Sequence, residues 1–340
     1  MGCNLRDLTT PHAVELHDFD GQRIAVDAFL IAYQFITSLR SRGSGQDGGP
    51  LRDANGHPVS HLMGFLDRAT AMVEAGIDPV FVFDGRPHEL KSDTLAERKK
   101  RKIEAKEKWD AAVDAEDWDT AQKLGSQIAS FTPEMVAETR KMLDLLGIAN
   151  IEAPMEAEGA SAVRCARGEV AAVASQDWDT LLYGAPVMVR NLVSHGTKKF
   201  GRVVKAERVY LKELLDDHGI THEQLVDLGI MVGTDFHPGI KGIGPKTGLK
   251  LIREHGTLEE ICIVKKIEVP EKLDEIRSLF LNHPTSDTPL PDSTMCDEQG
   301  LREMLVEGHN FSERRMTRAM NRMHNVGRLR TTGQTSLFDF

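Results

Sequence analysis

Apolar residues follow two patterns along this chain, and the two patterns alternate. Short, continuous apolar runs of the kind found in buried parallel strands are separated by stretches in which apolar residues recur at helical spacing. Strands that alternate with helices are joined by right-handed crossovers and build a parallel sheet. The pattern therefore predicts an α/β fold, with strands at residues 22–28, 79–85, 170–174 and 187–192.

The rest of the chain is predicted to form loops and helices. Residues 41–57 are rich in Gly and polar residues, and residues 282–300 are rich in Pro, Asp, Thr and Ser, so both are predicted to be loops. A helix that follows residue 222 should stop at Gly233, because glycine commonly ends helices. Helices are predicted at residues 29–39, 60–75, 133–147, 156–167, 209–218, 223–232, from about 245 onward, and 311–323.

Carboxylates gather where the predicted strands end. Asp27 and Asp84 close two apolar runs, and Asp177 with Asp179 follows a third. Glu156 and Glu158 form a second close pair where a helix is predicted to begin. In an open α/β sheet the loops at the carboxyl ends of the strands line the ligand crevice. The acids are either helix caps and loop residues or, if they converge, ligands of a hard cation that neutralises their repulsion.

Composition describes an ordinary globular chain with an uneven charge distribution. The 340 residues are 40% hydrophobic and 28% charged, with a net charge of −10. No apolar run is long enough to span a bilayer, no signal segment is evident at the N-terminus, and the four scattered cysteines favour a reducing compartment. Residues 86–108 nevertheless carry a net charge of +4 and residues 311–330 one of +5, so each stretch is either a solvated face or a surface for phosphates.

The segment from Gly242 through Gly244 to Lys246 is predicted to be a tight turn that leads into a helix. Exposed backbone N–H groups and Lys246 would suit a phosphate there. Pro245 stands where a nucleotide-binding P-loop has a glycine, and no strand precedes the turn, which excludes a P-loop. The remaining alternative is an ordinary connection between two helices.

Taken together, these motifs resemble the flap endonucleases of the structure-specific five-prime nuclease family. The resemblance runs nearly end to end, and only 72 positions separate Asp84 from Glu156, a short spacer that is similar to that of flap endonucleases. The segments that carry it are MGCNL, VDAF, VFDGRPHELK, EAPMEAEGASA, SQDWDTLLYG and GTDFHPGIKGIGPKTG.

The resemblance implies an architecture and a set of partners. It implies a mostly parallel central sheet with helices on both faces, in a nuclease core over residues 1–260. Within that core, residues 86–132 would form a helical arch and residues 223–256 a helix–turn–helix element that grips duplex DNA, often with K⁺. Residues 261–325 would be a C-terminal helical part and residues 326–340 a flexible tail. A monomer in an archaeal cytoplasm is expected, or a nuclear protein if the source is eukaryotic.

The resemblance also implies roles for individual residues. Family members cut five-prime flaps and act as five-prime exonucleases in Okazaki-fragment processing and long-patch base-excision repair. Lys91 and Arg98 match basic residues that contact the scissile phosphate, and Tyr33 matches an aromatic residue on which a base stacks, although without the resemblance it reads equally well as a core residue. DNA contacts would also come from Gly2, Gly242, Gly244 and Lys246. Two Mg²⁺ ions would be held by Asp27, Asp84, Glu156, Glu158, Asp177, Asp179 and Asp235.

The tail resembles a motif that binds the sliding clamp of replication. Gln334, Leu337 and Phe340 fall at the first, fourth and seventh places of that motif. The chain ends at Phe340, so the usual second terminal aromatic is absent, and Phe338 adds apolar area without replacing it. The alternative is an apolar end without a partner.

Two other classes of function remain open at the level of sequence. DWDT, residues 177–180, resembles the Asp-x-Asp-x-Thr motif of an aspartate-nucleophile phosphatase, although Leu181 stands at the place of its Thr, and that class leaves the other five acids unexplained. A non-catalytic, clamp-tethered DNA-binding protein would not need the set of seven carboxylates.

Overall fold

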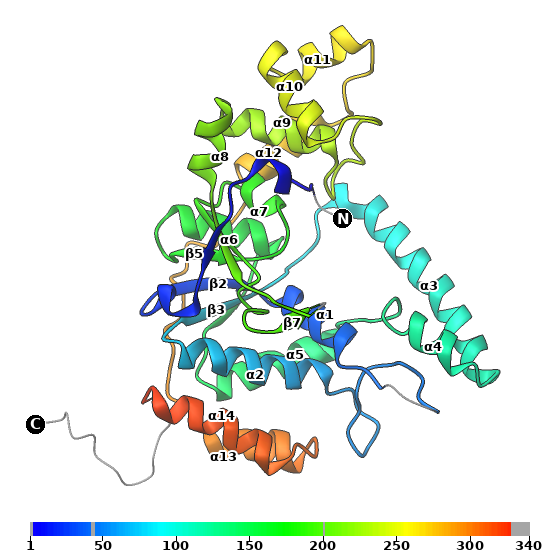
Figure 1. The fold of residues 1–340 in the computed structure, drawn as a ribbon, viewed down its shortest axis with the longest axis vertical. Coiled ribbons are helices and arrows are strands. Elements are labelled where there is room, and N and C mark those ends of the chain that lie inside the picture. The colour runs from blue at the N-terminus through cyan, green and yellow to red at the C-terminus, as the bar shows by residue number, and fades with distance from the viewer. Residues whose placement is uncertain (1–2, 42–44, 200, 328–340) are drawn as a thin grey trace, which may run out of the picture. The chain divides into compact units, whose positions relative to one another are not determined.

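The computed structural model describes residues 3–41, 45–199 and 201–327, which form two compact units (Figure 1). Among the described residues, the first unit contains 3–30, 80–104, 151–199 and 201–289, and the second contains 31–41, 45–79, 105–150 and 290–327. The chain passes between the units several times, so each unit is assembled from segments far apart in the sequence.

A mixed seven-stranded sheet forms the centre of the first unit. Its strands are β1 (His12–Val14), β2 (Arg23–Asp27), β3 (Asp78–Phe83), β4 (Asn150–Glu152), β5 (Ala172–Ala174), β6 (Val187–Arg190) and β9 (Ala206–Tyr210). Their order across the sheet is β1-β9-β6-β5-β2-β3-β4. The α/β prediction is confirmed, and the strands β2, β5 and β6 pair in parallel as expected. The sheet is mixed because β9 runs antiparallel to β6, and β1 antiparallel to β9.

The central strands are apolar because they are buried. Ile24 and Val26 of β2 lie opposite Ala172 and Ala174 of β5, and all four are almost completely shielded from solvent. Parallel pairing brings the carboxyl ends of these two strands to the same edge of the sheet. Asp27 at the end of β2 and the turn that follows β5 therefore meet at that edge.

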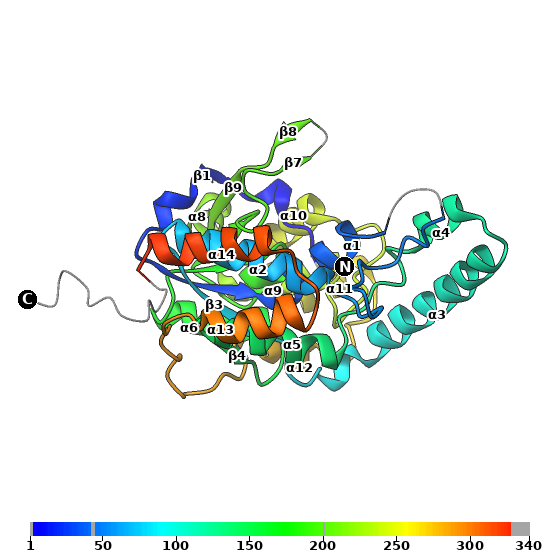
Figure 2. The same ribbon diagram turned by 90° about the horizontal axis from the view of Figure 1, so that it is seen from below.

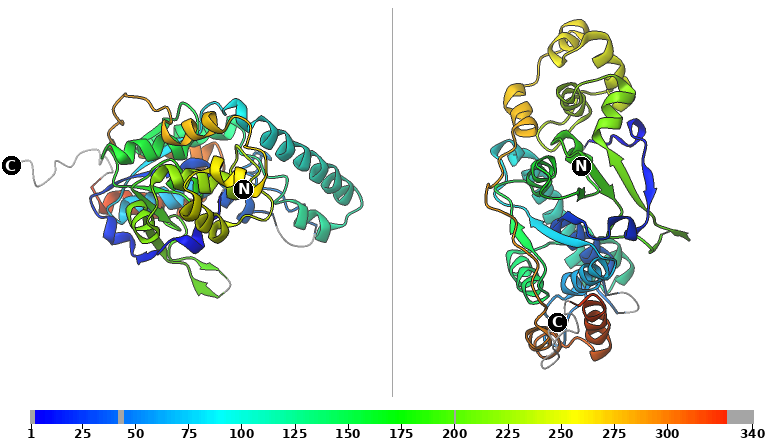
Figure 3. Two further views of the ribbon diagram at one scale, coloured as in Figure 1. Left: turned by 90° about the horizontal axis from the view of Figure 1, so that it is seen from above. Right: turned by 90° about the vertical axis from the view of Figure 1, so that its left-hand side faces the viewer.

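Helices surround the sheet, and several of them gather at one end of the first unit (Figures 1 and 3). The predicted helix over residues 209–218 begins two residues late, because Val209 and Tyr210 complete β9. A small hairpin of β7 (Lys198–Lys199) and β8 (Arg202–Val203) extends away from the sheet (Figure 2). The helices are α6 (Ala157–Ala166), α7 (Asp179–Leu182), α8 (Leu211–His218), α9 (His222–Val232), α10 (Pro245–His255), α11 (Leu258–Lys265) and α12 (Leu273–Leu281).

The ends of α9 and α10 follow from their sequences. Thr221 and Gln224 form a reciprocal capping box at the start of α9, and Gly233 ends that helix at φ +115°, a backbone conformation that side chains disfavour. Pro245 occupies the first turn of α10, where its missing N–H costs nothing. Helix α9 lies within one residue of its predicted limits, and α10 begins at the predicted residue.

The second unit is a helical assembly around α2 (Ser60–Glu74). Helix α2 packs against α5 (Pro133–Leu145) and α14 (Glu313–Asn325), and α14 runs beside it in Figure 2. A side chain at Gly64 would meet the Phe35 ring at 2.1 Å, so glycine permits the close approach between α2 and the helix that carries Phe35. The remaining helical segments are α1 (Ala28–Ser38), which enters from the first unit, α4 (Trp118–Leu124), α13 (Glu298–Leu301) and a π-helix (Arg302–Glu307).

The basic stretch after β3 is helical, as predicted. Helix α3 (Ser92–Asp114) runs from the first unit into the second, and of its 23 residues only Ala105 and Ala112 are buried. This explains why the stretch has no continuous apolar face in the sequence. In the described part of the chain, no helix is both long enough and apolar enough to cross a membrane.

Candidate metal centre and nucleic-acid interface

The predicted carboxylates come from five segments of the first unit, and each stands at the end or the beginning of an element. Asp27 ends β2, Asp84 follows β3, Glu156 and Glu158 open α6, Asp177 and Asp179 open α7, and Asp235 follows α9. Asp84, Glu156 and Glu158 lie close enough for one oxygen of each to be within 4.8 Å of the others. A single ion could therefore contact all three.

Backbone N–H groups hold several of these carboxylates in place. Oδ1 of Asp84 accepts a hydrogen bond of 2.8 Å from the N–H of Ala157, and Oδ1 of Asp27 accepts one of 2.8 Å from the N–H of Phe29. Oδ1 of Asp179 accepts one of 2.9 Å from the N–H of Cys3, 176 positions away. The N-terminal segment thus orients a candidate ligand through its backbone, which the identity of Cys3 could not reveal.

Burial and mutual repulsion raise the proton affinity of the cluster. Burial, and then the charge of Asp84, raise the pKa of Asp27 to about 7. Burial also raises the pKa of Asp84 to about 6, with Glu156 and Asp235 adding to the rise. For Glu158 and Asp179 burial is again the main cause of a raised pKa, and neighbouring acids add to it. The ionised forms of these buried carboxylates are therefore unfavourable without a nearby positive charge. A bound divalent cation would stabilise them.

The donor set fits a hard cation. Every group in the cluster is a carboxylate, and oxygen-only ligands suit Mg²⁺ or Mn²⁺ rather than softer metals. Seven carboxylates are more protein ligands than one Mg²⁺ ion uses, because a bound Mg²⁺ keeps several water ligands.

Lys91 and Arg98 lie directly against this cluster. The Nζ of Lys91 contacts Oε2 of Glu156 and lies 3.1 Å from Oδ2 of Asp235. Nη2 of Arg98 lies 2.6 Å from Oδ1 of Asp235. Burial by itself would raise the pKa of Asp235, but these two cations outweigh it and the pKa is lowered. The two basic residues predicted from sequence are therefore near the acids, and both are bound to them.

A hollow of about 520 Å³ opens beside the cluster. Asp27, Glu158 and Asp177 line it together with Arg6 and Arg190. The guanidinium of Arg190 stacks on the Trp178 ring, 4.2 Å from its centre. Sequence reasoning missed both arginines, because neither belongs to a run of basic residues.

Comparison with known proteins agrees with this arrangement. Residues 2–105 match the XPG N-terminal domain and residues 147–235 match the XPG I-region. Flap endonuclease 1 of Aeropyrum pernix is 39% identical over 350 aligned residues, which cover 100% of this chain and 99% of that one. The chain belongs to the flap endonuclease family.

Solved structures show the same fold. The structure of flap endonuclease-1 from Methanococcus jannaschii superimposes with a TM-score of 0.75 at 34% identity, covering 96% of this chain and 98% of that one. The catalytic core of Rad2 in complex with a DNA substrate shares the fold, with a TM-score of 0.69 at 21% identity and coverage of 91% and 95%.

The turn between α9 and α10 gives this flap endonuclease family member an open surface that carries one exposed lysine. Gly242 has a φ of +84°, which favours glycine, and neither Gly242 nor Gly244 has an atom within 4 Å of the place where a side chain would begin. Lys246 is 75% exposed and lies 3.2 Å from Asp7. A phosphate could therefore approach the backbone of this turn directly.

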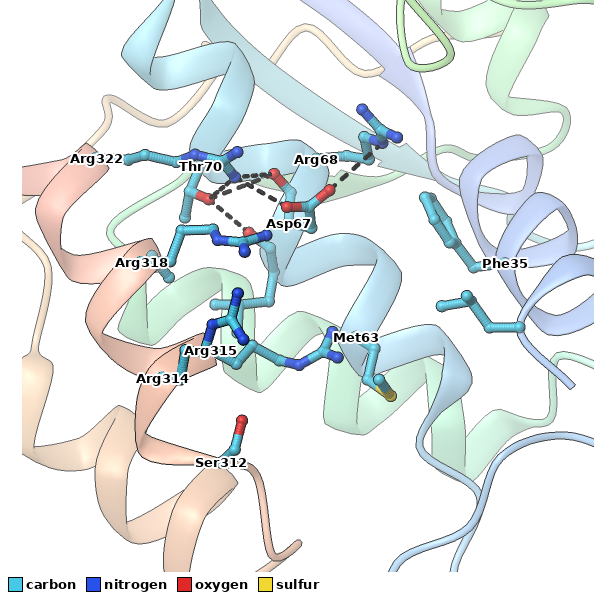
Figure 4. A pocket seen from close by; sticks show the side chains of 13 residues that line it. Phe35, Met63, Asp67, Arg68, Thr70, Ser312, Arg314, Arg315, Arg318 and Arg322 are labelled. Atoms are coloured by element: carbon cyan, nitrogen blue, oxygen red, sulfur yellow. Dashed lines mark hydrogen bonds and ion pairs between the residues drawn. The ribbon is translucent and has the colours of Figure 1, made fainter. Parts of the chain in front are cut away.

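The second unit carries a separate cluster of arginines (Figure 4). Four of them project from α14 into a hollow of about 440 Å³, beside Arg68 of α2. Arg322 pairs with Asp67 at 3.0 Å, whereas the other three on α14 form no ion pair within the described residues. Those three are Arg314, Arg315 and Arg318.

Of the other predicted DNA and clamp contacts, only Tyr33 lies among the described residues. The side chain of Tyr33 lies on α1 and is 42% exposed, so its interpretation as a core residue is wrong. The remaining predicted contacts lie outside the described residues: Gly2, Gln334, Leu337, Phe338 and Phe340.

The raised pKa of Asp27 predicts a pH-dependent penalty on the metal-free fold. Between the usual pKa of 3.8 and the folded value of about 7, the folded state holds a proton that the unfolded state releases, so stability falls as pH rises. Asp27→Asn removes this penalty while keeping an oxygen for the N–H of Phe29. In EDTA, we expect the variant to melt at least about 2 °C above the wild type at pH 8 and equal to it near pH 4.

The prediction concerns the difference in melting temperature between Asp27→Asn and the wild type. Buried His61 and His283 have pKa values lowered to about 4, so their titration raises stability with pH and masks the trend in either protein alone. Differential scanning calorimetry at both pH values makes the comparison. An equal difference at pH 4 and pH 8 would contradict the raised pKa.

Proposed function

We propose that this protein is a structure-specific nuclease that hydrolyses DNA at five-prime flaps and also removes nucleotides as a five-prime exonuclease. Its place would be Okazaki-fragment processing and long-patch base-excision repair. The observation that carries the proposal is a cluster of seven carboxylates linked by electrostatic interactions, in which Asp84, Glu156 and Glu158 lie within reach of one ion, with Lys91 and Arg98 bound to the same cluster. The name of the Aeropyrum pernix relative agrees with it.

We assign the carboxylates to two Mg²⁺ ions. Asp84 and Glu158 would hold one ion, Asp177 and Asp179 the other, and Asp27, Glu156 and Asp235 would bind directly or through water. Paired metals supply an activated water and stabilise the leaving oxygen in phosphodiester hydrolysis. The backbone N–H groups that orient Asp27, Asp84 and Asp179 fix the ligands before the ions arrive.

Lys91 and Arg98 would change partners during the reaction. In the absence of metal they neutralise Glu156 and Asp235. Divalent ions on these acids would release both side chains toward the scissile phosphate, where fixed positive charge stabilises the charge that develops. Arg190 and Arg6, which line the adjacent hollow, would hold a neighbouring phosphate.

Separate surfaces would bind the rest of the DNA. The open turn with Gly242, Gly244 and Lys246 suits duplex phosphates, with K⁺ as a bridging ion. The exposed ring of Tyr33 would stack on a base, and residues 86–132 would form the arch through their helices α3 and α4. The unpaired arginines of α14 would contact a second stretch of duplex backbone.

Removing two of these arginines should weaken binding in a salt-dependent way. Each phosphate contact contributes about 0.9 to the slope of log affinity against log salt. We expect Arg314→Ala with Arg318→Ala to lower that slope by about 2 and to leave single-turnover cleavage at saturating enzyme unchanged. Fluorescence anisotropy with a flap duplex over a series of salt concentrations measures the slope. Lys212→Ala, an exposed lysine on α8, is the matched control, and an unchanged slope in the arginine variant would show that α14 does not touch DNA.

We further propose that residues 334–340 tether the protein to a sliding clamp. Gln334, Leu337 and Phe340 supply the spacing of the motif. A peptide of residues 327–340 titrated against the cognate clamp tests this, and absence of saturable binding would rule it out. We expect the protein to act as a monomer, and the archaeal relatives favour an archaeal cytoplasm.

End-labelled DNA gives the decisive test of the activity. Double-flap, nicked and hairpin substrates are incubated with and without Mg²⁺. We expect cleavage near the base of the five-prime flap only when Mg²⁺ is present, with slower removal of nucleotides from nicked DNA. Turnover of a small phosphomonoester without cleavage of branched DNA would support a phosphatase instead, although that class would leave five carboxylates of the cluster unexplained. Binding of the branched DNA without cleavage would support a non-catalytic, clamp-tethered DNA-binding protein.

A further inference from the structure

A second group of metal-ligating side chains lies in the second unit, and the nuclease chemistry does not use it. His57 comes from the loop that the Arg52–Pro58 bridge closes, Glu138 from α5, and His309 from the turn after the π-helix. One ligand atom of each lies within 4.8 Å of the other two. Nε2 of His57 is 2.8 Å from Oε1 of Glu138, and the two histidine rings are 5.1 Å apart.

Neighbouring side chains contact two of these three residues and orient them. Nδ1 of His309 lies 3.1 Å from Oδ2 of Asp53, which leaves its Nε2 available. Nε2 of His61, a fully buried residue, lies 3.2 Å from Oε2 of Glu138 and leaves Oε1 to face His57. A histidine whose second nitrogen donates to a carboxylate is the arrangement that fixes the tautomer of a metal ligand.

Asp53 is itself held firmly. Its Oδ1 accepts the backbone N–H groups of Asn55 and His57, each within 2.9 Å, so the loop that carries His57 is folded around this carboxylate. The same residue therefore positions the backbone of one candidate ligand and the ring of another, His309.

The arrangement is incomplete without an additional partner. Nε2 of His57 is buried, and although Oε1 of Glu138 is near it, the contact lacks hydrogen-bond geometry, so this nitrogen has no hydrogen-bond partner within the described residues. A buried polar atom without a partner costs free energy, and native structures normally satisfy it with protein, water or an ion.

We propose that His57, Glu138 and His309 form a zinc site, with a water as the fourth ligand. Tetrahedral zinc with ligands at about 2.0–2.2 Å spaces neighbouring ligand atoms by about 3.3 Å, so the present group needs only small shifts. Two imidazoles and one carboxylate suit Zn²⁺ or Co²⁺ and are poor ligands for Mg²⁺. The donor types therefore separate this site from the all-carboxylate cluster of the first unit.

The bound ion would join three segments that are far apart in the sequence. It would fasten the loop around residues 51–59 and the turn at residues 308–310 to α5. Because such a site does not exist in the unfolded chain, binding stabilises the folded state. Zinc should therefore raise the melting temperature of the protein in excess Mg²⁺ by about 2–4 °C.

Cobalt provides a direct probe. The full-length protein is freed of metal with a chelator, dialysed, and titrated with Co²⁺ in excess Mg²⁺, which occupies the carboxylate cluster. We expect one equivalent of Co²⁺ to give the visible absorption bands of a four-coordinate site, and one equivalent of Zn²⁺ to remove them. His57→Ala and His309→Ala should bind at least ~100-fold more weakly, and Asp53→Asn ~10–100-fold more weakly.

His17→Ala is the matched control, because His17 is an exposed histidine beside an aspartate, Asp18, in the first unit. It should bind Co²⁺ like the wild type. The proposal is overturned if the wild type gives no bands, or if His57→Ala and His309→Ala give wild-type bands. If either variant misfolds by circular dichroism, X-ray absorption at the zinc edge of the wild type decides: two imidazole nitrogens support the site, and an oxygen-only shell contradicts it.

Discussion

Asp179→Ala is expected to lower the rate of flap cleavage by several orders of magnitude while leaving affinity for flap DNA largely intact. Asp179 is buried, opens α7 and is held by the N–H of Cys3, so it cannot be replaced by a neighbouring acid. Its loss removes a direct ligand from one of the two proposed ions, and the chemistry depends on the pair.

Single-turnover cleavage of end-labelled flap DNA, alongside binding in Ca²⁺, measures the two effects separately. Asp217→Ala on α8 is the control, since that carboxylate lies outside the cluster. The metal-free variant should also melt at or above the wild-type temperature at pH 8, because burial and the charge of Asp177 raise the pKa of Asp179 and make its ionised form unfavourable. Near-normal cleavage by Asp179→Ala would remove this residue from the metal centre.

Lys91→Ala and Arg98→Ala should each slow the chemical step by about 10²–10³-fold. Both side chains lie against the carboxylates that the ions would occupy, so they are already within reach of a phosphate bound there. The conservative changes Lys91→Arg and Arg98→Lys should restore part of the rate, since they keep the charge but alter its geometry.

Saturating enzyme distinguishes chemistry from affinity in this experiment. Arg101→Ala is the matched control on the same helix, because Arg101 is exposed and pairs only with Glu97 among the described residues. If high enzyme concentration restores the wild-type rate to Lys91→Ala and Arg98→Ala, the two residues hold DNA and take no part in the chemical step.

Most of the candidate metal centre follows from a local pattern in the sequence. Asp27 and Asp84 directly end or follow buried apolar strands, and in a parallel sheet such positions meet at one edge. Asp235 is different: no strand precedes it, and only the family resemblance joined it to the others. Its contacts with Lys91 and Arg98 come from a loop after α9 that no periodicity could place.

Other features were beyond sequence reasoning for identifiable reasons. Strands β1 and β9 were missed or read as helix, since β1 is short and mostly exposed and β9 continues directly into α8. The role of Cys3 depends on its backbone, which any residue could supply. The histidine site of the second unit joins residues 57, 138 and 309, whose spacing resembles no metal motif.

Anomalous diffraction from crystals soaked in Mn²⁺ tests the central claim most directly. We expect two peaks about 3.5–4 Å apart in the carboxylate cluster, one beside Asp84 and Glu158 and one beside Asp177 and Asp179, with Lys91 displaced from Glu156. No peak in the cluster, with Lys91 still bound to Glu156 and Asp235, would contradict the two-metal account.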